Sequence, residues 1–199
     1  MERNTSSTRS KAVWGGRALL IGLGAALLLA SSCSEAVRQG TGSSYLVIST
    51  LTGGPENGAT VESDVVSDEG GIVQDSGQAT LTLQMKDIGG PGPSPVNSIT
   101  ITQYRVEYIR SDGHNVQGVD VPFAFSSAVT VTVAGSATVP FTLVRAQAKH
   151  EAPLKALGGH GGAQHISTVA RVTFYGRDQT GREVSVTGNI EVSFADWAG

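Results

Sequence analysis

The stretch Ile166–Phe194, ISTVARVTFYGRDQTGREVSVTGNIEVSF, decides the fold. Apolar residues recur at every second position on both sides of a polar centre, first at Ala170, Val172 and Phe174, and then at Val184, Val186, Ile190, Val192 and Phe194. A period of two residues is typical of a strand with one buried face. The residues Asp178-Gln179-Thr180-Gly181 between the two runs fit a type I turn. Two strands of this length cannot bury their apolar faces alone, so we expect a hairpin that packs on a second sheet.

Further strands are predicted upstream of this hairpin. They cover residues 45–51, 78–88, 98–110, 129–133 and 139–143, with a short strand near 64–66 and an edge segment at 118–125. Within 98–110 the apolar phase slips near Thr102-Gln103, which indicates either a β-bulge or burial of both faces. One helical turn can begin at Pro153 and run through Leu157. About seven or eight short strands separated by turns predict an all-β fold, an antiparallel β-sandwich.

The predicted final hairpin also carries a resemblance. The run Phe174–Val186, with its Asp-x-x-Gly turn before a valine-rich closing strand, resembles the last hairpin of bacterial extracellular immunoglobulin-like domains. The resemblance extends mainly over residues 98–196 and implies an immunoglobulin-like sandwich. The cysteine pair and core tryptophan of antibody domains are absent, so the resemblance concerns architecture and not ancestry.

The N-terminal segment has the pattern of an export signal. Basic residues precede the continuous apolar run Ala18–Ala30, and small residues follow it up to Cys33, the only cysteine of the chain. Spanning a bilayer needs about 20 apolar residues, so a shorter run with these flanks indicates a cleaved signal peptide. The residues Leu29-Ala30-Ser31-Ser32-Cys33 resemble the lipobox of bacterial lipoproteins, although Ala30 stands where that family prefers Leu. Ordinary secretion with an unmodified cysteine is the alternative.

The lipobox resemblance and the strand pattern together imply a division of the chain into three parts. Residues 1–32 are the signal peptide, residues 33–43 are the lipidated Cys33 with a flexible tether, and residues 44–199 are the immunoglobulin-like domain. In that family the cysteine thiol takes a diacylglycerol, and Ser34 after it implies transport to the outer membrane. Two or more acyl chains hold a protein stably on a bilayer, whereas one holds it marginally. We therefore expect a protein of the cell envelope, on the periplasmic face or at the cell surface.

The charge of the chain after cleavage indicates which classes of partner are unfavourable. Cleavage before Cys33 removes four of the 14 Lys and Arg residues and one of the 17 Asp and Glu residues, which leaves a net charge of −6. The remaining 167 residues contain no basic block. This argues against nucleic acid and against electrostatic docking to anionic lipid.

Three kinds of candidate site are visible in the sequence. His150, His160 and His165 fall within one glycine-rich loop beside Glu151 and could hold Zn²⁺ or Cu²⁺, or could simply be exposed. An oxygen-rich segment could hold Ca²⁺ through Asp64, Asp68, Glu69 and Asp75, although it lacks the usual calcium-loop spacing. Aromatic residues could form a stacking platform for sugars or could belong to the core: Tyr104, Tyr108, Phe123, Phe125, Tyr175 and Trp197.

The expected function is binding or scaffolding at the cell envelope, without catalysis or a cofactor. Gly159-His160-Gly161-Gly162 superficially resembles the oxyanion-hole stretch of some lipases, but the chain has no Gly-x-Ser-x-Gly nucleophile elbow. No nucleophile, base and orienting group can be assembled from spacing. The expected partners are the membrane, through lipid on Cys33, and an envelope protein or a glycan. A glycan- or metal-binding module, using exposed aromatics or the loop 150–165, is the alternative function.

Overall fold

A computed structural model describes residues 42–54, 56–67 and 71–197, which belong to one compact unit. The predicted signal peptide and Cys33 lie outside the described residues. No helix in the described part of the chain is long and apolar enough to cross a membrane.

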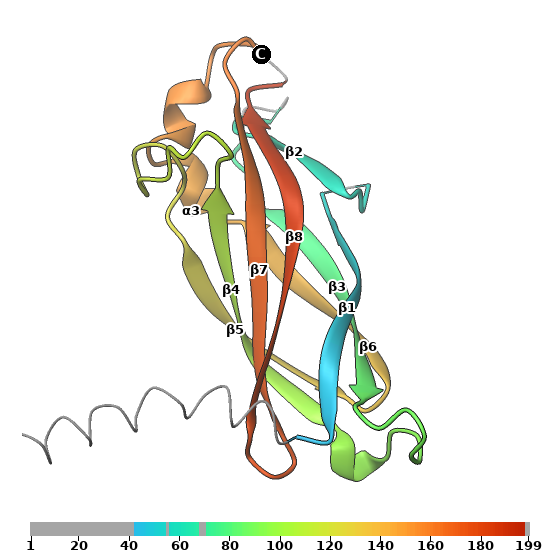
Figure 1. Cartoon of the computed structure of the whole chain (residues 1–199). Helices are drawn as coiled ribbons and strands as arrows, with labels where there is room; N and C mark the ends of the chain where they lie inside the picture. Colours follow the sequence, from blue (N-terminus) through green and yellow to red (C-terminus); the bar gives the residue numbers. More distant parts are fainter. Residues whose placement is uncertain (1–41, 55, 68–70, 198–199) are drawn as a thin grey trace, which may run out of the picture. The chain divides into compact units, whose positions relative to one another are not determined.

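Two sheets form a β-sandwich, as the alternating pattern predicts (Figure 1). The three-stranded sheet has the order β1 (Ser44–Gly53), β3 (Asp75–Met85), β6 (Ser136–Val144). The five-stranded sheet has the order β2 (Thr60–Asp64), β8 (Glu183–Ala195), β7 (Ile166–Asp178), β4 (Ile99–Ile109), β5 (Phe125–Val133). Three short helical segments complete the described elements: η1 (Pro95–Asn97), α3 (Ala146–Lys149) and η2 (Leu154–Leu157). The strand order is immunoglobulin-like, with β1, β3 and β6 in the places of strands A, B and E, and β8, β7, β4 and β5 in those of G, F, C and C′.

Four details differ from the predictions. The sandwich is not purely antiparallel, because β2 pairs with β8 in parallel. The short strand expected near 64–66 lies at 60–64. The segment 118–124 is a loop and not an edge strand, since its hydrogen bonds are local: Gly118 N–H donates to Val121 O at 2.8 Å and Asp120 N–H to Val116 O at 2.8 Å. The expected turn after Pro153 is confirmed as η2, whereas the short helix α3 was not expected.

The C-terminal hairpin confirms the pattern read from the sequence. Ala170, Val172 and Phe174 are fully buried, and β7 pairs with β8 without a break in register. Gly181 N–H donates to Asp178 O at 2.9 Å and closes the turn. Burial alone would raise the pKa of the Asp178 carboxyl, but hydrogen bonds from the Thr180 hydroxyl and from the Arg182 and Thr180 amides lower it overall.

The predicted phase slip in β4 is a β-bulge. The register of β4 against β7 shifts between Ile101 and Gln103, so that Thr102 is an extra residue. The bulge allows Ile99 and Ile101 on one side of it, and Tyr104, Val106 and Tyr108 on the other, to face the same core. Gly176 of β7 lies opposite, where a side-chain Cβ would come within 2.4 Å of Thr100 O.

Tyr104 of β4 lies at the centre of the core. Its ring contacts Phe125, Phe141 and Phe174, with centroids 6.4, 5.8 and 6.2 Å away. The Phe141 ring lies directly over Gly77 of β3, where a Cβ would come within 2.4 Å of it. Aromatic pairs at such distances contribute beyond the area they bury.

Two tyrosine hydroxyl groups connect β4 to the backbone of β6 in the opposite sheet. Tyr108 Oη donates to Leu143 O at 2.7 Å, and Tyr104 Oη accepts from Thr142 N–H at 3.0 Å. Since β6 has a strand neighbour on one side only, these groups provide partners for its main chain within the core. Burial, with a smaller contribution from the Asp75 carboxylate, holds the pKa of Tyr108 well above its ordinary value, so the hydroxyl keeps the proton that it donates.

We expect Tyr108→Phe to lower the free energy of unfolding by about 1–3 kcal/mol, because the buried Leu143 carbonyl loses its donor. Urea unfolding measures the change. Tyr175→Phe is the matched control, since Tyr175 lies on the outer face of β7 and is 38% exposed. A change below about 0.5 kcal/mol for Tyr108→Phe, equal to that of an ordinary surface substitution, would contradict the role of this bond.

Candidate functional site

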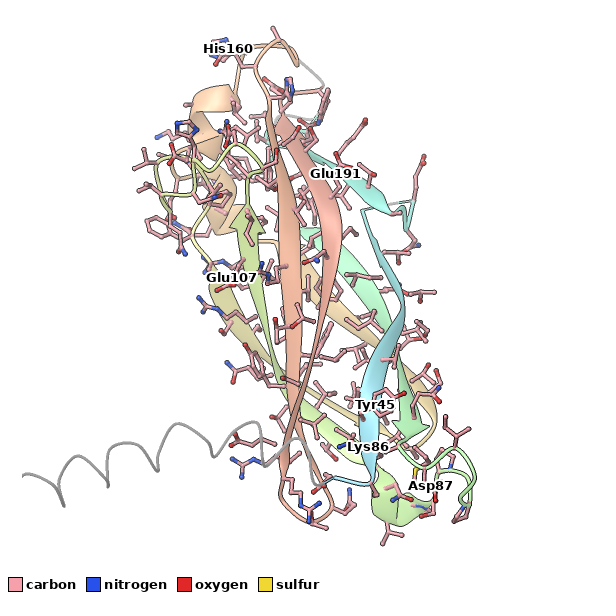
Figure 2. The ribbon with its side chains drawn as sticks, in the orientation of Figure 1. Tyr45, Lys86, Asp87, Glu107, His160 and Glu191 are labelled. Carbon is pink, nitrogen blue, oxygen red and sulfur yellow. The ribbon has the colours of Figure 1, made fainter. Side chains whose placement is uncertain are left out.

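The three histidines considered as candidate metal ligands are exposed, which was the other interpretation of this loop, and they are not gathered into a site. His150 follows α3, His165 precedes β7, and His160 lies in the loop between η2 and β7, at the end of the sandwich seen in Figure 2. The segment between them is fixed by Leu154 and Leu157, which are buried in the core. Within the described ranges, no group of three or more His, Cys, Asp or Glu side chains could hold a metal ion.

Two of the four candidate calcium ligands are instead partners of a buried lysine, Asp75 through its carboxylate and Asp64 through its main-chain carbonyl. Lys149 Nζ lies 3.0 Å from Asp75 Oδ2 and donates to Asp64 O at 2.7 Å. Ser63 Oγ donates to the same Asp75 oxygen at 2.6 Å. The Lys149 side chain is only 2% exposed. Asp68 and Glu69 lie outside the described residues.

This cluster has a structural role. It connects α3 to the end of β2 and the start of β3, and Trp197 N–H donates to Asp64 Oδ1 at 3.1 Å, so the C-terminal segment joins it. The sequence carries no periodic signal that Lys149 is buried, because its helix is a single turn. Both carboxylates are therefore engaged within the protein.

The predicted aromatic platform is divided between core and surface. Tyr104, Tyr108 and Phe125 are buried. Tyr175, Phe123 and Trp197 are partly exposed, but they come from β7, from the loop before β5 and from the C-terminal segment. The most relevant exposed aromatic was missed: Tyr45 of β1 is 44% exposed.

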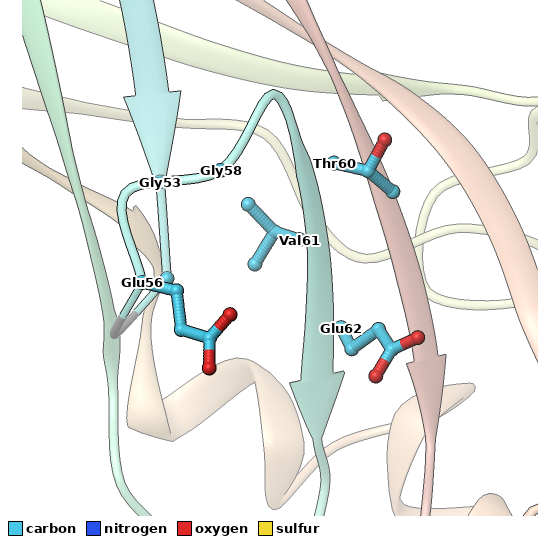
Figure 3. Close-up of a pocket in the computed structure, with 7 residues that line it drawn as sticks. Gly53, Glu56, Gly58, Thr60, Val61 and Glu62 are labelled. Carbon is cyan, nitrogen blue, oxygen red and sulfur yellow. The ribbon is translucent and has the colours of Figure 1, made fainter.

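A hollow of about 440 Å³ lies at the turn between β1 and β2 (Figure 3). Its wall consists of Gly53, Gly54, Glu56, Gly58, Thr60, Val61 and Glu62. Gly53 and Gly58 close the turn with hydrogen bonds of 3.0 and 2.9 Å in the two directions. Among its described residues, the lining offers two carboxylates but no histidine, cysteine or lysine beside them.

The described strands of the three-stranded sheet present no charged side chain on their outer face. Strands β1, β3 and β6 contain one ionisable acid or base among Asp, Glu, Lys, Arg and His, namely Asp75, and its carboxylate is the partner of buried Lys149. The residues that alternate with the buried ones on this face are Tyr45, Val47, Thr50, Thr52, Ser76, Gln78, Thr80, Thr82, Gln84, Ser136, Thr138, Pro140 and Thr142.

The outer face of the five-stranded sheet is different. Arg105 pairs with Glu107 at 2.8 Å, and Arg177 pairs with Glu183 at 3.0 Å. Exposed Arg171 and Glu191 lie on β7 and β8. Figure 2 shows Glu107 and Glu191 on this sheet, whereas Tyr45 lies on the other. The two faces therefore present different chemistry to partners.

Hydroxyl groups form a connected network on the uncharged face. Ser49 Oγ donates to Thr80 O at 3.0 Å and lies 3.2 Å from Thr82 Oγ1. On the side of β6, Thr82 Oγ1 lies 3.5 Å from Ser136 Oγ, and Thr80 Oγ1 lies 3.5 Å from Thr138 Oγ1. Neighbouring strands lie about 4.8 Å apart, so the network presents regularly spaced hydroxyl groups.

Comparison with known proteins identifies no family. No family model and no curated protein matches the chain. Among solved structures, a Pseudomonas fluorescens alkylpurine DNA glycosylase, AlkC, bound to DNA containing an abasic site analog, shows a likeness with a TM-score of 0.30 and 12% identity. The likeness covers 80% of this chain and 35% of that one, so this chain spans about a third of that protein. A TM-score at this level carries no argument about fold or function.

We expect Lys149→Met to lower the free energy of unfolding by about 3–5 kcal/mol, because removing one member of a buried ion pair leaves the other charge uncompensated. Urea unfolding at neutral pH measures the change. Arg177→Met, which breaks the exposed pair with Glu183, serves as the control and should cost about 0–1 kcal/mol. Equal effects of the two substitutions would show that the Lys149 cluster does not hold the end of β2 to the start of β3.

We expect Zn²⁺ to leave the melting temperature unchanged, because the side chains of His150, His160 and His165 are exposed and come from separate positions around α3, η2 and β7. Thermal unfolding with and without the ion provides the test, and the double substitution His160→Ala/His165→Ala is the comparison. A rise in melting temperature that the double substitution abolishes would restore the metal-binding interpretation of this loop.

Proposed function

We propose that the chain is a lipid-anchored protein of the cell envelope, sent to the outer membrane, whose sandwich binds or scaffolds without catalysis. The observation that carries the proposal is the segment Arg17–Cys33, in which a short apolar run ends on the only cysteine. The first strand begins at Ser44, eleven residues after that cysteine. A segment of about ten residues reaches at most about 35 Å, so an anchor on Cys33 would keep the sandwich close to the bilayer.

The hydrogen bonds of Ser43, just before the first strand, support an anchor at the N-terminal end of the domain. Ser43 O accepts from Lys86 N–H at 3.0 Å, and Ser43 Oγ accepts from Asn97 Nδ2 at 3.0 Å. These bonds fix the start of the domain to the loop between β3 and β4. In Figure 1 this loop and the turn between β7 and β8 lie at one end of the sandwich, with the C-terminal segment at the other. An anchor at Cys33 would hold the first end toward the membrane.

Surface chemistry supports a binding role. The uncharged outer face of the three-stranded sheet offers hydroxyl groups, carboxamides and the exposed ring of Tyr45, which are recognition groups and not a proton-transfer pair. The described lining of the hollow in Figure 3 offers the carboxylates of Glu56 and Glu62 and the hydroxyl group of Thr60 as hydrogen-bonding groups. A surface of this kind can hold a partner by contact alone.

The mass of the N-terminal peptide of the protein from native membranes tests the anchor. We expect a peptide that begins at Cys33 and carries diacylglycerol, and we expect Cys33→Ala to remain uncleaved and to lack the lipid. The thiol is the acceptor of the lipid, so the substitution removes the chemistry and leaves the rest of the signal intact. An unmodified Cys33, or a mature chain that begins elsewhere, would overturn the lipoprotein proposal.

A further inference from the structure

We propose that the uncharged face and the loop after β3 together form a binding site for a neutral polysaccharide, with Tyr45 and Gln84 on the face and Asp87 in the loop. This site names a class of ligand for the binding role proposed above, and it rests on that role. It does not depend on the lipid anchor.

Tyr45 and Gln84 are direct cross-strand partners in the pairing of β1 with β3. Both side chains are exposed on the outer face, where directly opposed residues have Cβ atoms about 5 Å apart. An aromatic ring beside a carboxamide offers a sugar both a stacking surface and a planar donor–acceptor group. Stacking of this kind tolerates different sugars, whereas the amide fixes the direction of hydroxyl groups.

A hollow of about 210 Å³ adjoins Gln84 and gives the site depth. It is lined by Gln84, Met85, Asp87, Ile88, Gly90, Pro91, Gly92 and Pro93. Figure 2 shows Tyr45, Lys86 and Asp87 at this end of the sandwich. The exposed Asp87 supplies a carboxylate acceptor, which can receive hydrogen bonds from two neighbouring hydroxyl groups of a sugar ring.

The loop that forms this hollow is held in place. Asp87 Oδ1 accepts from Gly89 N–H at 3.0 Å, and Pro91, Pro93 and Pro95 restrict the backbone. Further along the loop, Asn97 Oδ1 accepts from Ser94 N–H at 3.2 Å and from Ser94 Oγ at 2.7 Å. A loop that is already ordered loses less entropy when a ligand binds.

The chemistry of the whole face favours a neutral, hydroxyl-rich polymer over other partners. The strands of the face offer no cationic group for phosphate or nucleic acid, and the nearby loop residues Lys86 and Asp87 are of opposite sign. Ser and Thr dominate this face, and their hydroxyl groups can both donate to and accept from the hydroxyl groups of a sugar. A polysaccharide lying along the sheet would exchange its hydroxyl hydrogen bonds with the network of Thr80, Thr82 and Thr138.

Affinity electrophoresis tests the proposal with the full-length expressed chain purified in detergent. The gels contain soluble neutral polysaccharides, namely a β-glucan, a galactomannan and a xylan, or the anionic polymer polygalacturonate. We expect at least one neutral polymer to retard the protein and polygalacturonate to leave it unretarded. Tyr45→Ala should weaken the apparent affinity about tenfold, equivalent to about 1.4 kcal/mol, and Gln84→Ala should weaken it as well.

Tyr175→Ala is the matched control, because Tyr175 is a similarly exposed tyrosine, 38% against 44%, on the charged sheet. We expect it to leave the retardation unchanged, and unchanged melting temperatures confirm that each variant is folded. The proposal is overturned if no neutral polymer retards the protein, if polygalacturonate retards it equally, or if the two tyrosine variants lose affinity alike. A dimer that Tyr45→Ala dissociates would assign the face to a second copy instead. Measuring the N-terminal peptide mass on the same preparation keeps failure of the anchor separate from failure of the sugar site.

Discussion

The contact between β4 and β6 is the constraint on which the sandwich depends. Dispersion and apolar burial hold two sheets together without fixing how one is placed on the other. The hydroxyl groups of Tyr104 and Tyr108 add direction, because they meet the backbone of neighbouring residues, Thr142 and Leu143. The bulge at Thr102 makes these two hydrogen bonds possible. Without its extra residue, the side chains that follow it would change faces, and both tyrosines would point to solvent.

Once the sheets are placed, the domain has two outer faces that differ in charge. The five-stranded face carries paired charges such as Arg177 and Glu183. The three-stranded face carries none, and the acid at the start of β3, Asp75, is engaged by Lys149 inside the structure. The burial of that pair thus contributes both to the attachment of β2 and β3 and to the neutrality of the outer surface. The proposed sugar site lies where this surface meets the loop after β3.

The sequence pattern predicted those parts of the fold that depend on residues close together in the chain. The hairpin of β7 and β8 and the bulge in β4 follow from a period of two and its interruption. The parallel pairing of β2 with β8 joins residues more than 100 positions apart, and no local pattern encodes such a register. The candidate site could not be predicted from the sequence for the same reason. Tyr45 and Gln84 become neighbours only through the pairing of β1 with β3. The three histidines were candidates because they are close together in the sequence. In the described structure they are exposed on a loop and form no group that could hold a metal ion.

The most direct test of the central claim is native-state hydrogen exchange at the amide of Thr142, the donor to Tyr104. If the β4–β6 contact places the two sheets, this amide should exchange only through global unfolding, with an opening free energy equal to that of the whole domain. An opening free energy close to zero, like that of frayed or exposed backbone, would show that β6 separates from β4 while the rest remains folded. The sandwich would then be held by its apolar core alone.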